Sequence, residues 1–151
     1  MIQEDKELLL KDICGRMPYG VKVQIIYPTV AGVTTLDVSH IEKLKNNERY
    51  VVKPYLRPMS NMTEEEKEQI RDLWIDADTN THATRLIDFY NKNHFDYRGL
   101  IDKGLAIEVT EENNPYKDKS YDSTRVVRID IRNRLFLSYY IYRTNIFGLV
   151  A

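Results

Sequence analysis

The sequence contains a single cysteine, Cys14, among its 151 residues. One cysteine excludes an internal disulfide and any zinc site built from several cysteines. Long hydrophobic runs are missing too: the longest near-apolar stretch, Leu135 to Tyr142, is far shorter than the roughly 20 residues that cross a membrane. The acidic start, Met1 to Glu7, lacks the basic segment of a signal peptide. These absences predict a soluble, cytoplasmic protein in a reducing compartment, with no membrane partner.

Glycine is scarce as well, and the six glycines are dispersed, so no glycine-rich phosphate loop is present. The sequence also lacks a GxSxG motif, a kinase motif set and the HExxH spacing of a zinc protease. Its 22 basic and 23 acidic side chains leave a net charge of −1, which argues against a surface that binds polyanions all over. These gaps predict a protein that is not an enzyme and that needs no cofactor and no metal.

The residues that are present suit one folded domain over 1–151, because 42% are hydrophobic and 11 tyrosines provide bulky core material. We predict an α+β fold in three parts. The first (1–58) is a helix followed by a small antiparallel β-meander that could curl into an SH3-like barrel. The second (59–109) is a helical hairpin with a following strand, and the third (110–151) is a loop and a C-terminal β-hairpin.

The first helix is predicted over Glu4 to Cys14, because apolar residues recur there at helical spacing. That apolar stripe consists of Leu9, Leu10, Ile13, Cys14 and Met17. Since free cysteines are among the most buried residues, we expect Cys14 to be a buried hydrophobic side chain rather than a nucleophile.

Three β-rich segments predict the strands of the meander, and Pro54 should end the last of them. The predicted strands are Val21–Ile25, Val30–Val38 and Tyr50–Lys53, with a helical turn at Ile41–Leu44 between the second and the third. Pro54 to Ser60 then reads as a stiff extended connector, because two prolines restrict its backbone.

A capping box at Thr63 to Glu66 predicts the start of a helix over 64–77, and apolar spacing from Ala83 to His94 predicts a second helix. The range 63–78 carries seven acids and two bases, a net charge of −5, which would repel DNA. We therefore predict an ordinary helical hairpin rather than a DNA-binding helix-turn-helix. Leu105–Val109 is a candidate strand, and the polar stretch 110–123 predicts a mobile loop.

Three blocks of the sequence resemble a family of short uncharacterised proteins of gut bacteria and their phages or mobile elements. The blocks are Lys6–Asp12 with Pro18–Val21, then Lys53–Ser60 (KPYLRPMS) with Met62–Glu66 (MTEEE), then His94–Ile101 (HFDYRGLI). The resemblance covers roughly residues 6–109, and the residues after about 113 depart from it. It implies no established activity. It does imply a small cytoplasmic accessory protein of phage or mobile-element origin.

The remaining candidates for chemistry have structural interpretations that we favour. His82 and His94 lie 12 residues apart and so do not share a helix face, while His40 stands alone. We expect His94 to cap the end of its helix, where a donor meets free carbonyl groups. His94 and Asp96 could also belong to an enzyme site of an unfamiliar kind. The acidic residues of the first hairpin helix, namely Asp72, Asp76 and Asp78, are expected to form a solvated face.

The C-terminal hairpin is the strongest functional candidate in the sequence. Arg125 to Ile131 alternates apolar and charged residues, and Leu135 to Tyr142 is rich in aromatic and branched residues, so we predict two strands. Residues 125–143 carry a net charge of +4, and arginines with tyrosines are suited to phosphates and stacked bases. The residues of a predicted single-stranded nucleic-acid site are Arg125, Arg128, Arg132, Arg134, Tyr139 and Tyr140. The competing interpretation is that the tyrosines pack on the core and the arginines pair with the acidic helix.

The end of the sequence, 146–151, is apolar and uncharged, so we expect it to pack against the body or a second subunit. The predicted protein-interface residues are Ile146, Phe147, Leu149 and Val150, which would make the protein a homo-oligomer. The sequence as a whole predicts a small non-enzymatic binding or regulatory module that acts on a protein partner of unknown identity. The alternative is single-stranded nucleic-acid binding through the arginine- and tyrosine-rich hairpin.

Overall fold

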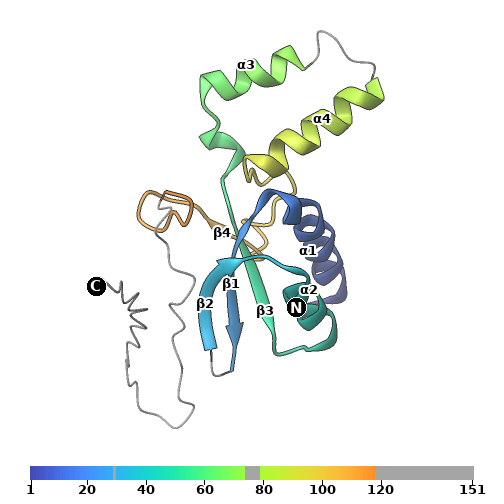
Figure 1. Cartoon of the computed structure of the whole chain (residues 1–151), viewed down its shortest axis with the longest axis vertical. Coiled ribbons are helices and arrows are strands. Elements are labelled where there is room, and N and C mark those ends of the chain that lie inside the picture. Colours follow the sequence, from blue (N-terminus) through green and yellow to red (C-terminus); the bar gives the residue numbers. More distant parts are fainter. Residues whose placement is uncertain (29, 74–78, 118–151) are drawn as a thin grey trace, which may run out of the picture.

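A computed structural model describes residues 1–28, 30–73 and 79–117 of the chain. The helices are α1 (Gln3–Arg16), α2 (Val38–Asn46), α3 (Glu64–Asp72) and α4 (Thr79–Lys92), with 3-10 helices η1 (Met17–Tyr19) and η2 (Met59–Asn61). The strands are β1 (Lys22–Tyr27), β2 (Val30–Thr35), β3 (Val51–Leu56) and β4 (Ile107–Glu108). These elements confirm the predicted α+β class (Figure 1).

The four strands form one mixed sheet in the order β2-β1-β3-β4. β1 is antiparallel to both β2 and β3, and the short β4 is parallel to β3. Within the described residues β2 and β4 are the two edges and do not pair with each other. The SH3-like barrel is therefore not confirmed.

β3 continues through Pro54 to Leu56, so the prediction that proline ends this strand is wrong. Pro54 is the last β3 residue paired with β1, opposite Val23, and Tyr55 is the first residue paired with β4. The proline lacks an N–H donor, and it lies where the strand changes partners. The expected extended connector is accordingly strand up to Leu56, and η2 follows it.

α2 is a complete helix where the sequence predicted the end of a strand and a single helical turn. Asp37 begins it, because the Asp37 carboxylate accepts the His40 N–H at 3.2 Å and the His40 ring accepts the Asp37 N–H at 3.1 Å. Ile41 and Leu44, three residues apart, are both buried. The predicted strand up to Val38 therefore ends earlier, and a capped amphipathic helix begins at Val38.

The apolar stripe predicted for α1 is right for Leu9 and Ile13, which are buried, and wrong for Cys14, which is exposed. The buried residues of the helix are Leu9, Asp12, Ile13 and Arg16, at spacings of three and four. Cys14 follows Ile13 by about 100° around the helix and so faces solvent. Asp12 and Arg16 are buried beside this stripe, because each neutralises the charge of the other in the interior.

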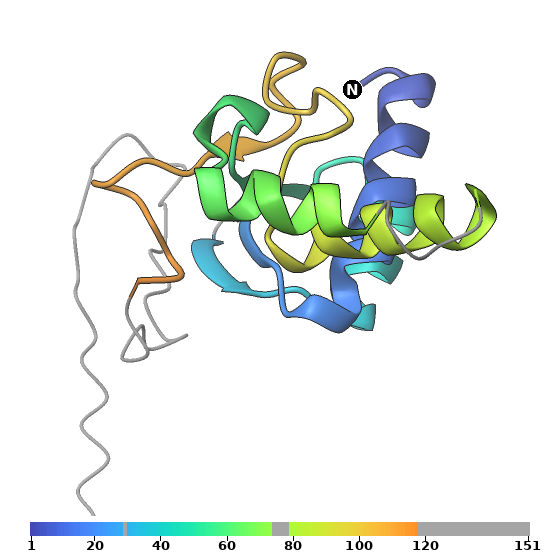
Figure 2. The same cartoon turned by 90° about the horizontal axis from the view of Figure 1, so that it is seen from above.

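The core lies between the sheet and the two helices α1 and α2, which lie together on one side of it (Figures 1 and 2). It includes Leu9 and Ile13 of α1 and Leu44 of α2. The turn segment after α4 closes this core with Leu100, Leu105 and Ala106. Asp96, Tyr97 and Arg98 of this segment take part in polar contacts described below.

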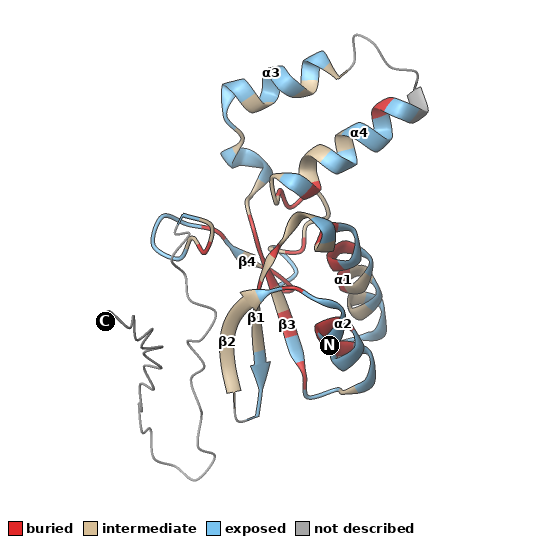
Figure 3. Ribbon diagram, in the orientation of Figure 1, coloured by how far each residue is buried: buried red, intermediate tan, exposed pale blue. Residues whose placement is uncertain are grey.

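α3 and α4 project together beyond the end of the sheet and form what we call the helical arm (Figure 1). No residue of α3 is buried, as the colouring in Figure 3 shows. The capping box at Thr63 is confirmed, since its hydroxyl accepts the Glu66 N–H at 3.2 Å and the Glu66 carboxylate accepts the Thr63 N–H at 2.8 Å. α3 ends at Asp72, and α4 begins at Thr79, before the predicted start at Ala83. In the described part of the chain, no helix is long and apolar enough to cross a membrane.

Candidate functional site

The predicted functional segments after residue 117 lie outside the described residues. These comprise the nucleic-acid candidates Arg125, Arg128, Arg132, Arg134, Tyr139 and Tyr140, and the interface candidates Ile146, Phe147, Leu149 and Val150. Asp76 and Asp78 also lie outside the described residues. What the structure does describe is a cluster of buried polar side chains around the end of α4, together with the surface of the helical arm.

α4 ends in a Schellman motif, with His94 at the left-handed position (φ 58°). The Phe95 N–H donates to the Tyr90 carbonyl at 2.9 Å, and the His94 N–H donates to the Asn91 carbonyl at 3.2 Å. The prediction is therefore right that His94 lies at the C-terminal cap of this helix and wrong that its side chain makes the capping bonds. The backbone makes the capping bonds, and the ring is directed elsewhere.

The His94 ring stacks on the ring of Tyr116, with centroids 4.3 Å apart and planes 14° from parallel. Burial, together with the neighbouring guanidinium groups of Arg16 and Arg57, lowers the pKa of His94 to about 4. The imidazole is therefore neutral at physiological pH, and Nδ1 is buried with no hydrogen-bond partner among the described residues. A neutral, stacked ring of this kind serves packing rather than proton transfer near pH 7.

The Tyr116 hydroxyl lies between two strands of the sheet, where the β1–β3 ladder stops. It accepts the backbone N–H of Lys22 at 3.1 Å and donates to the Tyr55 carbonyl at 2.9 Å. Burial is the largest cause that raises the pKa of Tyr116, so the hydroxyl stays protonated and able to donate. Tyr116 therefore attaches the described part of the predicted mobile loop, 110–117, to the sheet.

Replacing Tyr116 with phenylalanine should lower the free energy of unfolding by about 1–3 kcal/mol, because the Lys22 N–H and the Tyr55 carbonyl lose their partner. Urea unfolding followed by circular dichroism measures this change. Tyr19→Phe is the matched control, because its hydroxyl bonds Asp88 at an exposed position. The control should change stability by less than about 0.5 kcal/mol. Equal effects of the two substitutions would contradict the bridging role.

A buried ion pair within α1 also contacts the segment after α4. The Arg16 Nε and Nη2 atoms donate to the two carboxylate oxygens of Asp12 at 2.6 and 3.0 Å, and both side chains are fully buried. Arg16 Nη2 also donates to the Phe95 carbonyl at 2.7 Å. Arg98 Nε lies 3.4 Å from Asp12. The Arg16 guanidinium carbon lies 5.2 Å from the centre of the Tyr97 ring, so a cation–π contact adds to the cluster.

The carboxylate of Asp96, the other candidate for an unfamiliar enzyme site, accepts hydrogen bonds from the backbone. Its two carboxylate oxygens accept the N–H groups of Leu100 at 2.9 Å and Ile101 at 2.8 Å. Its own N–H donates to the Arg57 carbonyl at 2.8 Å. These bonds hold the turn that follows Asp96.

Arg57 connects the sheet to the helical arm. Its Nη1 and Nη2 atoms donate to the two carboxylate oxygens of Glu66 at 2.7 and 3.0 Å, and Nη2 also donates to the Asn61 carbonyl at 3.1 Å. Its guanidinium carbon lies 4.3 Å from the centre of the Phe95 ring. The bond to Arg57 is the main cause that holds the pKa of Glu66 below its usual value. This forked pair fixes the first turn of α3 against the core.

The rest of α3 is free of the core and is acidic. Glu65, Glu68 and Asp72 are exposed, and Glu64 pairs with Lys67 at 2.6 Å. Ile70 and Leu73 are half-buried, and Ile87 on α4 is 43% exposed. The position of Asp72 agrees with the predicted solvated face. The arm therefore offers carboxylates and apolar side chains on a helix that is fixed at one end.

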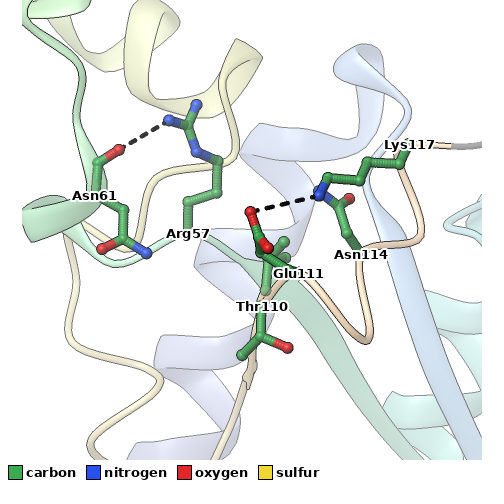
Figure 4. Close-up of a pocket in the computed structure, with 7 residues that line it drawn as sticks. Arg57, Asn61, Thr110, Glu111, Asn114 and Lys117 are labelled. Atoms are coloured by element: carbon green, nitrogen blue, oxygen red, sulfur yellow. Dashed lines mark hydrogen bonds and ion pairs between the residues drawn. The ribbon is translucent and has the colours of Figure 1, made fainter.

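A pocket of about 230 Å³ lies beside Arg57 (Figure 4). Asn61, Thr110, Glu111, Asn114 and Lys117 are among its lining residues. Its charged groups already have partners, since Arg57 is bonded as above and the Lys117 ammonium lies 3.9 Å from the Glu111 carboxylate. The pocket therefore gathers no reactive pair.

The other single-residue candidates are dispersed. His40 belongs to the cap of α2, and His82 Nδ1 lies 3.1 Å from the Leu73 carbonyl at the end of α3. Among residues 1–28, 30–73 and 79–117, no group of three or more histidine, cysteine or acidic side chains could hold a metal ion. The sequence did not point to Arg16, Arg57 or Tyr116. Only the four-residue spacing of Asp12 and Arg16 could have suggested an ion pair.

Comparison of the chain with known protein families, with curated proteins and with solved structures found no match. The resemblance to a family of phage or mobile-element proteins therefore stays a prediction. No function reaches this chain from a relative, and any assignment depends on its own geometry.

Proposed function

We propose that this protein is a small non-enzymatic binding or regulatory module that acts on a protein partner through its helical arm. One observation carries the proposal: α3 has no buried residue, although its first turn is fixed to the core. A short helix gains most of its stability from packing, and α3 instead has a capping box and an anchoring arginine. Its outer face is therefore available for contact with another molecule.

The chemistry of this face favours a basic partner. α3 carries five acids and two bases, with Glu65, Glu68 and Asp72 exposed. Carboxylates of this kind speed association with a positively charged surface, and the half-buried Ile70 and Leu73 add apolar area. A cytoplasmic location and an accessory role in a phage or mobile element remain part of the proposal, on the strength of the sequence alone. So does a homo-oligomer contact through 146–151.

Charge reversal on the arm tests this proposal. The full chain is used to capture proteins from a lysate of the native cells, and the affinity of the retained partner is then measured. We expect Glu65→Lys with Glu68→Lys to weaken binding by about 10-fold or more, about 1.4 kcal/mol, with an effect that shrinks at high salt. The matched control is Glu42→Lys with Glu48→Lys, which reverses two exposed charges away from the arm.

The control variant should bind like the unaltered chain. Retention of no protein, or equal affinity of the two variants, would contradict the proposal. Nuclease treatment of the lysate tests the alternative function, single-stranded nucleic-acid binding through 125–143. Material that is lost on this treatment, with a salt slope that flattens when Arg128 and Arg132 are replaced, would favour that alternative instead.

A further inference from the structure

β2 is an edge strand of the sheet. It pairs with β1 from Val30 to Thr35, and no strand of the described residues pairs with its other side. In an antiparallel sheet, every second residue of such a strand points its N–H and C=O groups away from its partner. β2 therefore presents a row of backbone donors and acceptors at the outer side of the sheet.

The sequence of β2 does nothing to block further pairing. Its residues are Val, Ala, Gly, Val, Thr and Thr, with no charge and no proline. Natural edge strands are usually protected by lysine, by proline or by a covering segment. None of its residues is buried, in a strand made only of small or β-branched side chains. An edge of this composition is suited to receive another strand.

The chain leaves the described fold within reach of this edge. The Tyr116 hydroxyl bonds the Lys22 N–H on the side of β1 that faces β3, and Lys22 pairs on its other side with Thr35 at the end of β2. Because neighbouring strands lie about 4.8 Å apart, the strand position beyond β2 is two to three spacings, roughly 10–15 Å, from this hydroxyl. Residues 118–124 could span roughly 23 Å if extended, which is ample for this distance. The residues that follow are therefore tethered within reach of the free edge.

We infer that residues 125–131 of this chain pair with the free edge of β2 and extend the sheet by one antiparallel strand. This segment alternates Val127, Ile129 and Ile131 with charged residues, as a strand with one covered face does. A strand that starts near Thr35 and runs toward Val30 is antiparallel to β2, so the tether delivers the segment in the right direction. The inference does not depend on the partner proposed for the helical arm.

Hydrogen exchange of the full chain, measured by NMR, tests the inference. We expect every second amide of β2 to exchange at least about 100-fold more slowly than in an unstructured peptide, because a neighbouring strand holds it. Val127→Asp with Ile129→Asp should remove this protection. The matched control is Tyr121→Asp with Ser123→Asp, which adds the same charges at the same spacing before the segment.

The amides of β1 and β3 report that the fold is intact in both variants. Protection of β2 that is lost in the first variant and kept in the control supports the inference. Fast exchange of the outward β2 amides in the unaltered chain would overturn it, and so would protection that survives Val127→Asp with Ile129→Asp. Protection that disappears on dilution, with a dimer mass by light scattering, would assign the edge to a second copy and overturn it too.

Discussion

Asp12→Asn should destabilise the protein by about 3–5 kcal/mol, the cost of leaving one buried charge without its partner. Asparagine has the shape of aspartate but no charge, and the Arg16 guanidinium would remain fully buried. Most domains are stable by only about 5–15 kcal/mol, so a loss of this size shifts the unfolding midpoint strongly. Urea titration followed by circular dichroism measures it.

Two further variants separate charge from packing. Asp12→Leu with Arg16→Met removes both charges together and should be far closer to the unaltered chain, because buried pairs can often be replaced by apolar residues of similar volume. Glu64→Gln breaks the exposed pair with Lys67 and should have little measurable effect. If Asp12→Asn were as mild as Glu64→Gln, the Arg16 charge would not depend on Asp12 for its compensation in the interior.

Acid should destabilise the protein through His94. The pKa of His94 is about 4 in the folded state, against 6.5 as its usual value, because the ring is buried and faces Arg16 and Arg57. Between these pH values the unfolded chain binds a proton that the folded chain does not bind. Above pH 6.5 His94 therefore causes no loss of stability. As the pH falls from 6.5 to about 4, the free energy of unfolding decreases through His94 by about 3 kcal/mol in total.

His94→Asn isolates this effect, because asparagine is well tolerated in the left-handed conformation that His94 adopts. The free energy of unfolding of both proteins is measured from pH 7.5 to pH 4. The difference in free energy of unfolding between the two proteins should shrink or reverse as the pH falls, because the carboxylates titrate equally in both proteins. Parallel curves for the two proteins would show that the ring is not held neutral by its surroundings.

Local patterns predicted much of the fold. The capping box at Thr63 needs only two side chains and two backbone groups within four residues, so it can be recognised from the sequence alone. The alternation in β1 and the apolar spacing of α4 are equally local. The start of α2 was not predicted, because the β-branched residues up to Val38 favoured a strand through Asp37, which is in fact the N-cap of the helix. Tertiary packing of Ile41 and Leu44 then decided in favour of a helix.

The polar cluster could not be predicted in the same way, because its contacts join distant parts of the chain. Tyr116 bonds Lys22, which lies 94 positions earlier in the chain, and Tyr55, which lies 61 positions earlier. Arg16 bonds the carbonyl of Phe95. Charged residues are mostly exposed in proteins, and only the fold shows that Arg16 is buried with the Asp12 carboxylate and the Phe95 carbonyl as partners. Cys14 was expected to be buried because it continues the apolar spacing of Leu9 and Ile13, yet it is exposed.

Photo-crosslinking along the helical arm tests the central claim, that this protein acts through contact with a protein partner. A photoreactive amino acid replaces Glu68 on α3 in the full chain, and in a second variant it replaces Glu42 on α2, both exposed positions. We expect a defined protein adduct from position 68 in native cells and none from position 42. Adducts from both positions alike, or from neither, would contradict it.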